Sequence, residues 1–190
     1  MIFRISVLAA ASLAIGWATP APAAEFERSG FWEFQSQAFA EEGDETWFVC
    51  SASTRSLEET ELSMRLEPTA DNGFEAAMSL SNETWALGRS LLSVRLDIGA
   101  DRWMLKGQGS GSTVEVAWSP DSHLLLFLED LASSSFAVLT ARDGSTIAQF
   151  SLSGSRKAIE AMKGCVESQI GQGLEAVLDA GPASDGANPF

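Results

Sequence analysis

The chain is poor in the side chains that most often carry chemistry. Its 190 residues include one histidine, His123, two cysteines and no tyrosine. A catalytic triad or a metal site needs several such groups in one place, with others behind them to orient them. Basic residues are also scarce, since 12 Lys and Arg stand against 26 Asp and Glu, a formal net charge of −14. A surface of this sign repels nucleic acid and anionic lipid, and it favours a basic partner or serves solubility.

The few candidate catalytic groups are poorly arranged in the sequence. His123 lies beside Asp121 and Ser122, but sequence neighbours do not make a triad. Glu129 and Asp130 are adjacent, so their side chains point in different directions and cannot flank one bond. The glycine-rich stretch Gly107–Ser112 lacks the lysine of a phosphate-binding loop. We therefore expect no enzymatic activity, no metal and no cofactor.

The first 24 residues have the features of a signal peptide. Arg4 precedes an apolar run over residues 5–17, and Ala21-Pro22-Ala23 offers small residues at the positions that the peptidase reads. The run is too short to span a membrane comfortably, so the mature chain is expected to have no transmembrane segment. The sequence thus predicts a periplasmic or secreted protein with one β-rich domain over residues 25–180. Residues 181–190 are small and polar, and we expect a disordered tail there.

The two cysteines, Cys50 and Cys165, are expected to form a disulfide. An even number of cysteines in an exported chain favours pairing, because the compartment is oxidising. A catalytic thiol would need a base beside it, and the chain has one histidine to offer. The bridge would tie the front of the domain to its C-terminal helix.

Apolar residues alternate with polar ones over most of residues 31–118. This period of two is typical of antiparallel strands with one face in water. Turn residues separate the runs at Asp71-Asn72-Gly73, at Gly99-Ala100-Asp101 and at Gly107–Ser112, which we interpret as a flexible hairpin loop. The pattern predicts a mainly β fold, an antiparallel β-sandwich or curved sheet with one or two helices, including the C-terminal helix tied by the disulfide.

The last third of the chain mixes helices with a hairpin. Residues 120–132 are apolar enough for a helix or a buried strand; Ser119-Pro120-Asp121, with Pro120 at the first helical position, favours the helix. Asp143-Gly144 predicts a two-residue hairpin turn between strands at 136–140 and 146–152. Ser155 is a candidate N-cap for a helix with an apolar stripe beside Cys165, and residues 174–180 can add a further turn or two.

The segment FAVLTARDGSTIAQFSLSGSRKAIEAMKGC, residues 136–165, resembles the closing module of a known family. A hairpin followed by a helix that ends on a cysteine is similar to the invasion-associated locus B family of exported alphaproteobacterial proteins. Accessory periplasmic proteins of type VI secretion systems end in a similar way. The Trp32-x-Phe34 strand and the strand Thr46–Cys50 are compatible with this resemblance. It implies a β-rich, non-enzymatic protein linked to the envelope or to host contact.

The leading hypothesis is an exported, non-enzymatic binding or interaction protein of the bacterial envelope, associated with host invasion if the resemblance holds. Its partner would be another protein, and the charge favours a basic one. One alternative is an acidic inhibitor of a basic envelope enzyme. Another is a carrier of a small ligand or lipid in a cavity between sheet and helix, lined by Trp85, Trp103 and Trp118, although these side chains can equally belong to the core.

Overall fold

The computed structural model describes residues 25–40, 46–70, 72–118 and 121–180. The predicted leader, the predicted tail and Pro120 lie outside these residues. Within the described chain there are ten strands and three helices. The strands are β1 (Glu25–Ser29), β2 (Trp32–Ala40), β3 (Thr46–Arg55), β4 (Glu61–Pro68), β5 (Phe74–Ser81), β6 (Leu87–Ile98), β7 (Asp101–Gly111), β8 (Thr113–Trp118), β9 (Phe136–Thr140) and β10 (Thr146–Ser151). The helices are α1 (Ser122–Ser133), α2 (Ser155–Ile170) and α3 (Leu174–Ala180).

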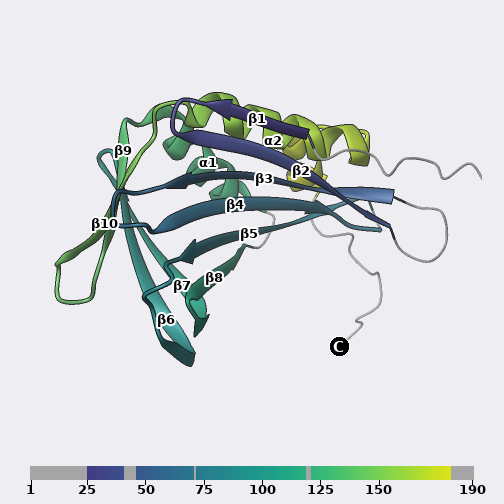
Figure 1. Cartoon of the computed structure of the whole chain (residues 1–190). Helices are drawn as coiled ribbons and strands as arrows, with labels where there is room; N and C mark the ends of the chain where they lie inside the picture. Colours follow the sequence, from purple (N-terminus) through teal and green to yellow (C-terminus); the bar gives the residue numbers. More distant parts are fainter. Residues whose placement is uncertain (1–24, 41–45, 71, 119–120, 181–190) are drawn as a thin grey trace, which may run out of the picture.

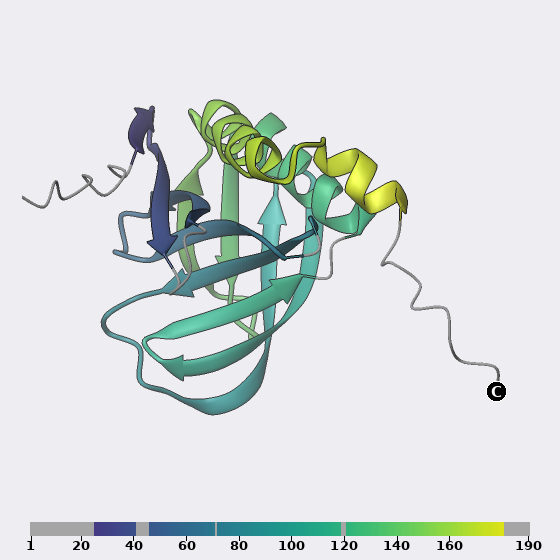
Figure 2. The same ribbon diagram turned by 90° about the vertical axis from the view of Figure 1, so that its right-hand side faces the viewer.

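All ten described strands form one antiparallel sheet, in the order β1-β2-β3-β4-β5-β8-β7-β6-β9-β10. The mainly β fold is confirmed, in its curved-sheet form. Strands β1 to β5 follow one another as a meander, and β5 then pairs with β8 instead of β6. In Figure 1 the sheet curls, so that β6, β7 and β8 bend away from the helices. Figure 2 shows the helices together along one end of this curved sheet.

The core lies on the inner face of the sheet, beneath α1 and α2. The alternation of the strands places one set of side chains inside, and β4 and β5 show this as regularly alternating burial. Trp32 of β2, Phe127 of α1 and Phe150 of β10 are among the largest fully buried side chains. These residues are far apart in sequence, so the same core joins the start, the middle and the end of the domain.

Helix α1 confirms the helical interpretation of residues 120–132, but its start differs from the prediction. Asp121 is the N-cap, and its carboxylate accepts hydrogen bonds from the backbone N–H groups of His123 and Leu124. The helix therefore begins at Ser122, beyond Ser119 and Pro120. An aspartate in extended backbone satisfies the free N–H groups of the first turn, which a proline start does not.

Helix α2 also begins differently from the prediction. Gly154 is the N-cap, with a left-handed φ of 95°, and Ser155 is the first helical residue. The buried Ser155 hydroxyl donates to the carbonyl of Leu131 at 2.7 Å instead of capping its own helix. The serine thus joins the start of α2 to the last turn of α1. Helix α3 follows at Leu174, as residues 174–180 predict.

Two turn predictions were wrong in detail. Most of the glycine-serine stretch is strand, because β7 continues to Gly111. A Cβ on Gly107 would lie 2.6 Å from Val114 Cγ1, and one on Gly109 would lie 2.9 Å from Leu92 Cδ1, so these glycines let neighbouring side chains pack tightly. The β9–β10 connection spans residues 141–145, and only Gly144 has a positive φ there. The Asp143 carboxylate accepts from Ser145 N–H and Oγ–H, which stabilises this longer loop.

Strand β10, at one edge of the sheet, and the residues after it lie against the β1–β2 turn and the start of β2. Phe31 N–H donates to the carbonyl of Ser153 at 3.0 Å, and Trp32 Nε1–H donates to the carbonyl of Ser151 at 3.0 Å. Two glycines permit this approach. A Cβ on Gly154 would lie 1.7 Å from the oxygen of Ser29, and a Cβ on Gly30 would lie 2.4 Å from the oxygen of Ser153. The β1–β2 turn and the β10–α2 junction can therefore touch only as backbone.

Asn82 is a buried polar side chain that joins two loops. Its Nδ2 donates to the carbonyl of Glu58 at 2.8 Å and to Thr60 Oγ1 at 3.0 Å. Its Oδ1 accepts from the backbone N–H and the hydroxyl of Thr84. The first two bonds hold the β3–β4 connection against the chain that leaves β5, and the two from Thr84 orient the Asn82 amide for them.

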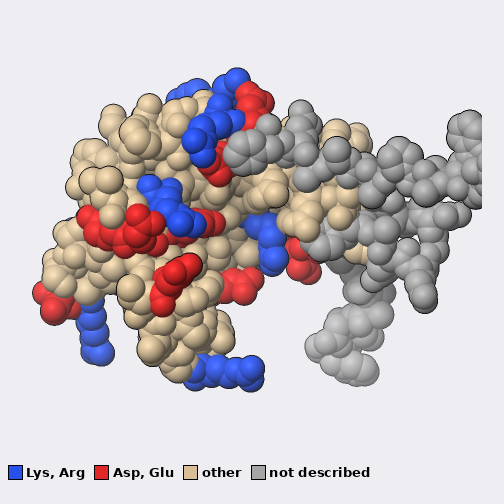
Figure 3. Space-filling view, viewed as in Figure 1, with Lys and Arg blue, Asp and Glu red and all other residues tan. Residues whose placement is uncertain are grey.

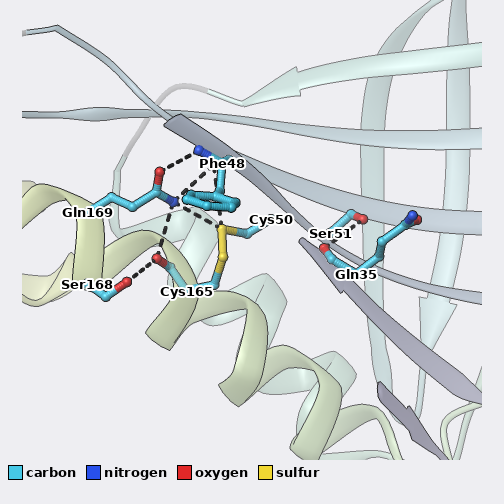
Figure 4. The surroundings of a disulfide bond; sticks show 7 residues. All are labelled: Gln35, Phe48, Cys50, Ser51, Cys165, Ser168 and Gln169. Carbon is cyan, nitrogen blue, oxygen red and sulfur yellow. Dashed lines mark hydrogen bonds between the residues drawn. A yellow bond between two sulfur atoms is a disulfide. The ribbon is translucent and has the colours of Figure 1, made fainter. Parts of the chain in front are cut away.

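The predicted disulfide is present between Cys50 of β3 and Cys165 of α2, with the two Cα atoms 6.1 Å apart. Beside it, the Gln169 amide pairs with the backbone of Phe48: Phe48 N–H donates to Gln169 Oε1 at 2.6 Å, and Gln169 Nε2 donates to the Phe48 carbonyl at 3.0 Å (Figure 4). The ladder with β4 stops at the pair Cys50–Leu66, and two residues further the register would set Phe48 opposite Pro68, which has no N–H. Gln169 Nε2 thus supplies the Phe48 carbonyl with the donor that Pro68 lacks.

Candidate binding surfaces

The structure places the candidate catalytic side chains His123, Glu129 and Asp130 against different partners. His123 is 73% exposed, and its Nδ1 lies 3.6 Å from the Asp121 carboxylate that caps α1. Asp130 accepts a hydrogen bond from Trp103 Nε1 at 2.9 Å, and Glu129 forms an ion pair with Arg156. No three His, Cys, Asp or Glu side chains of the described residues gather as a metal shell would require.

The shifted carboxyl groups in the described chain all have lowered pKa values. Hydrogen bonds, first from Arg95 and then from Arg102, lower the pKa of Asp97. Hydrogen bonds from Ser145 lower the pKa of Asp143, and backbone N–H groups act in the same direction on Glu58 and Glu175. A general acid working near neutral pH needs a raised pKa. These four carboxylates instead stay ionised and hold turns and ion pairs together.

Trp103 and Trp118 lie together beside α1. The ring centroid of Phe127 is 5.1 Å from that of Trp103 and 4.8 Å from that of Trp118. The two indoles meet at 6.0 Å, edge to face. Trp103 Nε1 donates to Asp130, whereas the buried Trp118 Nε1 has no hydrogen-bond partner among the described residues. This cluster fastens α1 to β7 and β8 as part of the core.

Trp85 is not part of that cluster. It lines a separate hollow of about 280 Å³, which we name the apolar mouth. Its wall is formed by the apolar side chains Leu80, Trp85, Leu87, Leu92, Val94, Val114, Leu139 and Ile147. Ser93, Thr140, Ala141 and Arg142 complete it. The mouth lies between the start of β6 and the β9–β10 loop, at the lower end of the molecule in Figure 1.

A second hollow, the outer trough, lies on the face of the sheet opposite α2. It measures about 480 Å³ and crosses β2, β3, β4, β5 and β8. The register explains its floor, because Ser63 and Ser79 are paired in one row across β4 and β5, and Glu115 of β8 continues that row. Ser51 of β3 is opposite Arg65, the next outward position along β4. Short hydroxyl side chains in the middle and longer side chains around them leave a depression.

The walls of the outer trough carry more acid than base. Gln35, Gln37 and Trp47 contribute neutral groups to the lining, while Glu67 and Glu115 contribute carboxylates. Arg65 is the basic lining residue, and it is paired with Glu115 at 3.5 Å, with both side chains about half exposed. Figure 3, viewed as in Figure 1, shows acidic and basic groups interspersed over this face.

Sequence reasoning missed both hollows. The alternation does identify Ser63 and Ser79 as outward-facing, but it does not say which strands are neighbours. Glu115 reaches the row of serines only because β5 pairs with β8, across the intervening β6 and β7. Arg142 and Leu92 meet at the apolar mouth for a similar reason, since β6 pairs with β9.

The fold and these hollows define a mainly β protein with a curved sheet, helices over its inner face and a disulfide between them. A comparison with solved structures finds invasion associated protein B from Bartonella henselae, at 14% sequence identity and a TM-score of 0.45, covering 73% of this chain and 95% of that one. No protein-family model and no curated protein match the chain. Membership of the invasion-associated family, and a role in invasion, therefore stay predictions.

None of the described helices combines the length and the apolar character needed to cross a bilayer.

Proposed function

We propose that the protein is an exported, non-enzymatic binding protein that engages a basic protein partner through the outer face of its sheet. The observation that carries the proposal is the outer trough. It is a depression of about 480 Å³ that none of the described helices lines, on a sheet whose opposite face is buried. A face of this kind is free to receive another surface.

Export is supported by two features of the chain. The sequence of residues 1–24 has the pattern of a cleavable leader. The Cys50–Cys165 bridge fits an oxidising compartment, where disulfides persist. Intact mass of protein recovered from the periplasm tests this step. We expect a chain that begins after Ala23 or Ala24, and recovery of a chain that still begins at Met1 would contradict export.

Charge supports the choice of a basic partner. Outward residues of β2, β4, β5 and β8 include Glu33, Glu61, Glu67, Glu75 and Glu115, whereas Arg55 and Arg65 are the basic residues on β3 and β4. The whole chain has the same sign of charge, at −14. Complementary charge speeds association, and exposed charges act over about 8 Å at physiological ionic strength. Binding through this face should therefore weaken as salt rises, mainly through the association rate.

The test compares two double variants of equal charge change. Glu67→Lys with Glu115→Lys reverses two carboxylates of the outer trough, and Glu129→Lys with Glu160→Lys reverses two beside the groove between α1 and α2. Each protein is used as bait in the native envelope extract, and the captured partner is then measured by surface plasmon resonance at several salt concentrations. We expect only the double variant Glu67→Lys with Glu115→Lys to stop binding the partner that wild-type protein captures. Equal binding by both variants, or binding that ignores salt, would contradict the proposal.

A further inference from the structure

We infer that the apolar mouth binds the hydrocarbon chain of a single-chain anionic amphiphile, with Arg142 pairing with its charged head. This site lies at the opposite end of the sheet from the helices and is separate from the outer trough. The inference therefore goes beyond the proposed protein partner and stands or fails independently.

The walls of the mouth suit a hydrocarbon chain. Leu80, Val94 and Val114 are buried at its base, while Trp85, Leu87 and Leu92 are only partly buried. Half-exposed apolar side chains around a hollow are a typical mark of a binding site. Burying their exposed surface under a ligand would add about 25 cal/mol for each Å² removed from water.

The size of the mouth limits the ligand. At about 280 Å³ it lies near the lower end of ligand pockets, which begin at about 300 Å³. A single alkyl chain can enter such a space end-on. A diacyl lipid or a large fused ring system is too wide for it.

Charge at the rim selects the head group. Arg142 lines the mouth. Neither Arg142 nor the nearby Arg89 and Lys106 forms an ion pair with a described carboxylate. Arg89 lies at the start of β6, and Lys106 is opposite Ser93, which lines the mouth. Figure 3 shows basic side chains extending from this end of the molecule. The acidic residue next to Arg142 in the sequence is Asp143, and its carboxylate already accepts hydrogen bonds from Ser145. The acidic residue nearest to Arg89 in the sequence is Glu83.

This arrangement is unusual for a chain of net charge −14. The other described Lys and Arg side chains lie within ion-pair distance of a carboxylate, as Arg65 does with Glu115. Free cations thus remain where the surface is also apolar. An alkyl chain in the mouth and an anionic head beside Arg142 would satisfy both features at once.

The experiment uses dodecanoate as the probe, below its micelle concentration, with purified mature protein in isothermal titration calorimetry. Wild-type protein should bind one dodecanoate. Arg142→Gln should weaken this binding about fivefold, which corresponds to about 1 kcal/mol. Arg156→Gln, which removes an arginine of the helix groove, is the matched control and should leave it unchanged. Dodecyltrimethylammonium, with the same chain and a cationic head, should bind Arg142→Gln at least as tightly as it binds wild type.

A second measurement locates the chain and does not depend on a variant that folds. A nitroxide-labelled dodecanoate should broaden the methyl NMR signals of Leu92 and Ile147, but not those of Leu126 on α1. Broadening at Leu126 alone, or no binding of dodecanoate, would overturn the inference. Equal affinity of wild type and Arg142→Gln for dodecanoate would also overturn it. So would binding to anionic vesicles of phosphatidylglycerol without binding to monomeric dodecanoate, because the site would then be a membrane surface.

Discussion

Removing the disulfide should cost much of the stability of this domain without abolishing its fold. The bond between Cys50 and Cys165 closes a loop of 115 positions. In the chain-entropy model a loop of about this length is worth about 5 kcal/mol, and measured losses for native bridges run from about 2 to 5 kcal/mol. Domains of this kind have unfolding free energies of about 5 to 15 kcal/mol in total.

The packing around the bridge decides how far the loss goes. Cys50 is fully buried, so the suitable variant is Cys50→Ala with Cys165→Ala, which leaves no buried thiol behind and removes only the two sulfur atoms. The amide of Gln169 still pairs with Phe48 after the bond is gone, so α2 stays in place on β3. We therefore expect a folded double variant whose free energy of unfolding is lower by about 2 to 5 kcal/mol, toward the upper value because the loop is long.

Urea denaturation followed by tryptophan fluorescence measures this difference. Wild-type protein in reductant is the matched control, because it loses the bond without any change of side chain, and it should unfold near the midpoint of the double variant. A double variant that stays within about 1 kcal/mol of oxidised wild type would refute the reasoning, since the bridge would then add almost nothing to what the packing supplies.

Two further outcomes follow from polar contacts within the domain. Asn82→Ala should lower the free energy of unfolding by about 3 kcal/mol in the same urea assay, because it removes the partner of the buried Thr60 hydroxyl and three part-buried bonds to Glu58 and Thr84; a loss below about 0.5 kcal/mol would contradict this role. Because Arg95 and Arg102 hold the pKa of Asp97 below its ordinary value, the stability from this carboxylate is fully present above that ordinary value, about pH 4, and is lost as pH falls through the lowered pKa. Asp97→Asn should therefore flatten the loss of stability below about pH 4, and an acid limb identical to that of wild type would count against the ion pair.

The sequence predicted local structure well where one physical signal dominated. Alternation identified the strands, and the apolar stripe of α2 brought Cys165 inward to its partner. The glycines of β7 predict a loop, but they lie within a strand. They are needed there because Val114 and Leu92 pack against the positions where side chains would begin. The sequence favours Ser155 as a helix cap, but its hydroxyl makes a buried bond to Leu131 that depends on how α1 and α2 are packed.

The site was less predictable than the fold. Trp85, Trp103 and Trp118 are alike in sequence terms, yet two of them pack against Phe127 and the third lines another hollow. The difference arises from the position of α1 over β7 and β8, which no local pattern encodes. Both hollows likewise depend on strand neighbours that are separated in the chain.

The contact between the β1–β2 turn and the β10–α2 junction has a consequence for how the chain reaches its native state. Strands β1 and β2 pair early with each other and with β3, but the β1–β2 turn meets its backbone partner only at residues 153–154, so this end of the sheet stays uncovered until those residues have been made. Contacts of such long sequence separation form slowly, and open strand edges bind to other chains. Synthesis from the N-terminus therefore produces a growing chain that stays incomplete for most of its length. A truncation before β10 should accordingly be lost to aggregation or proteolysis instead of accumulating as a smaller stable domain.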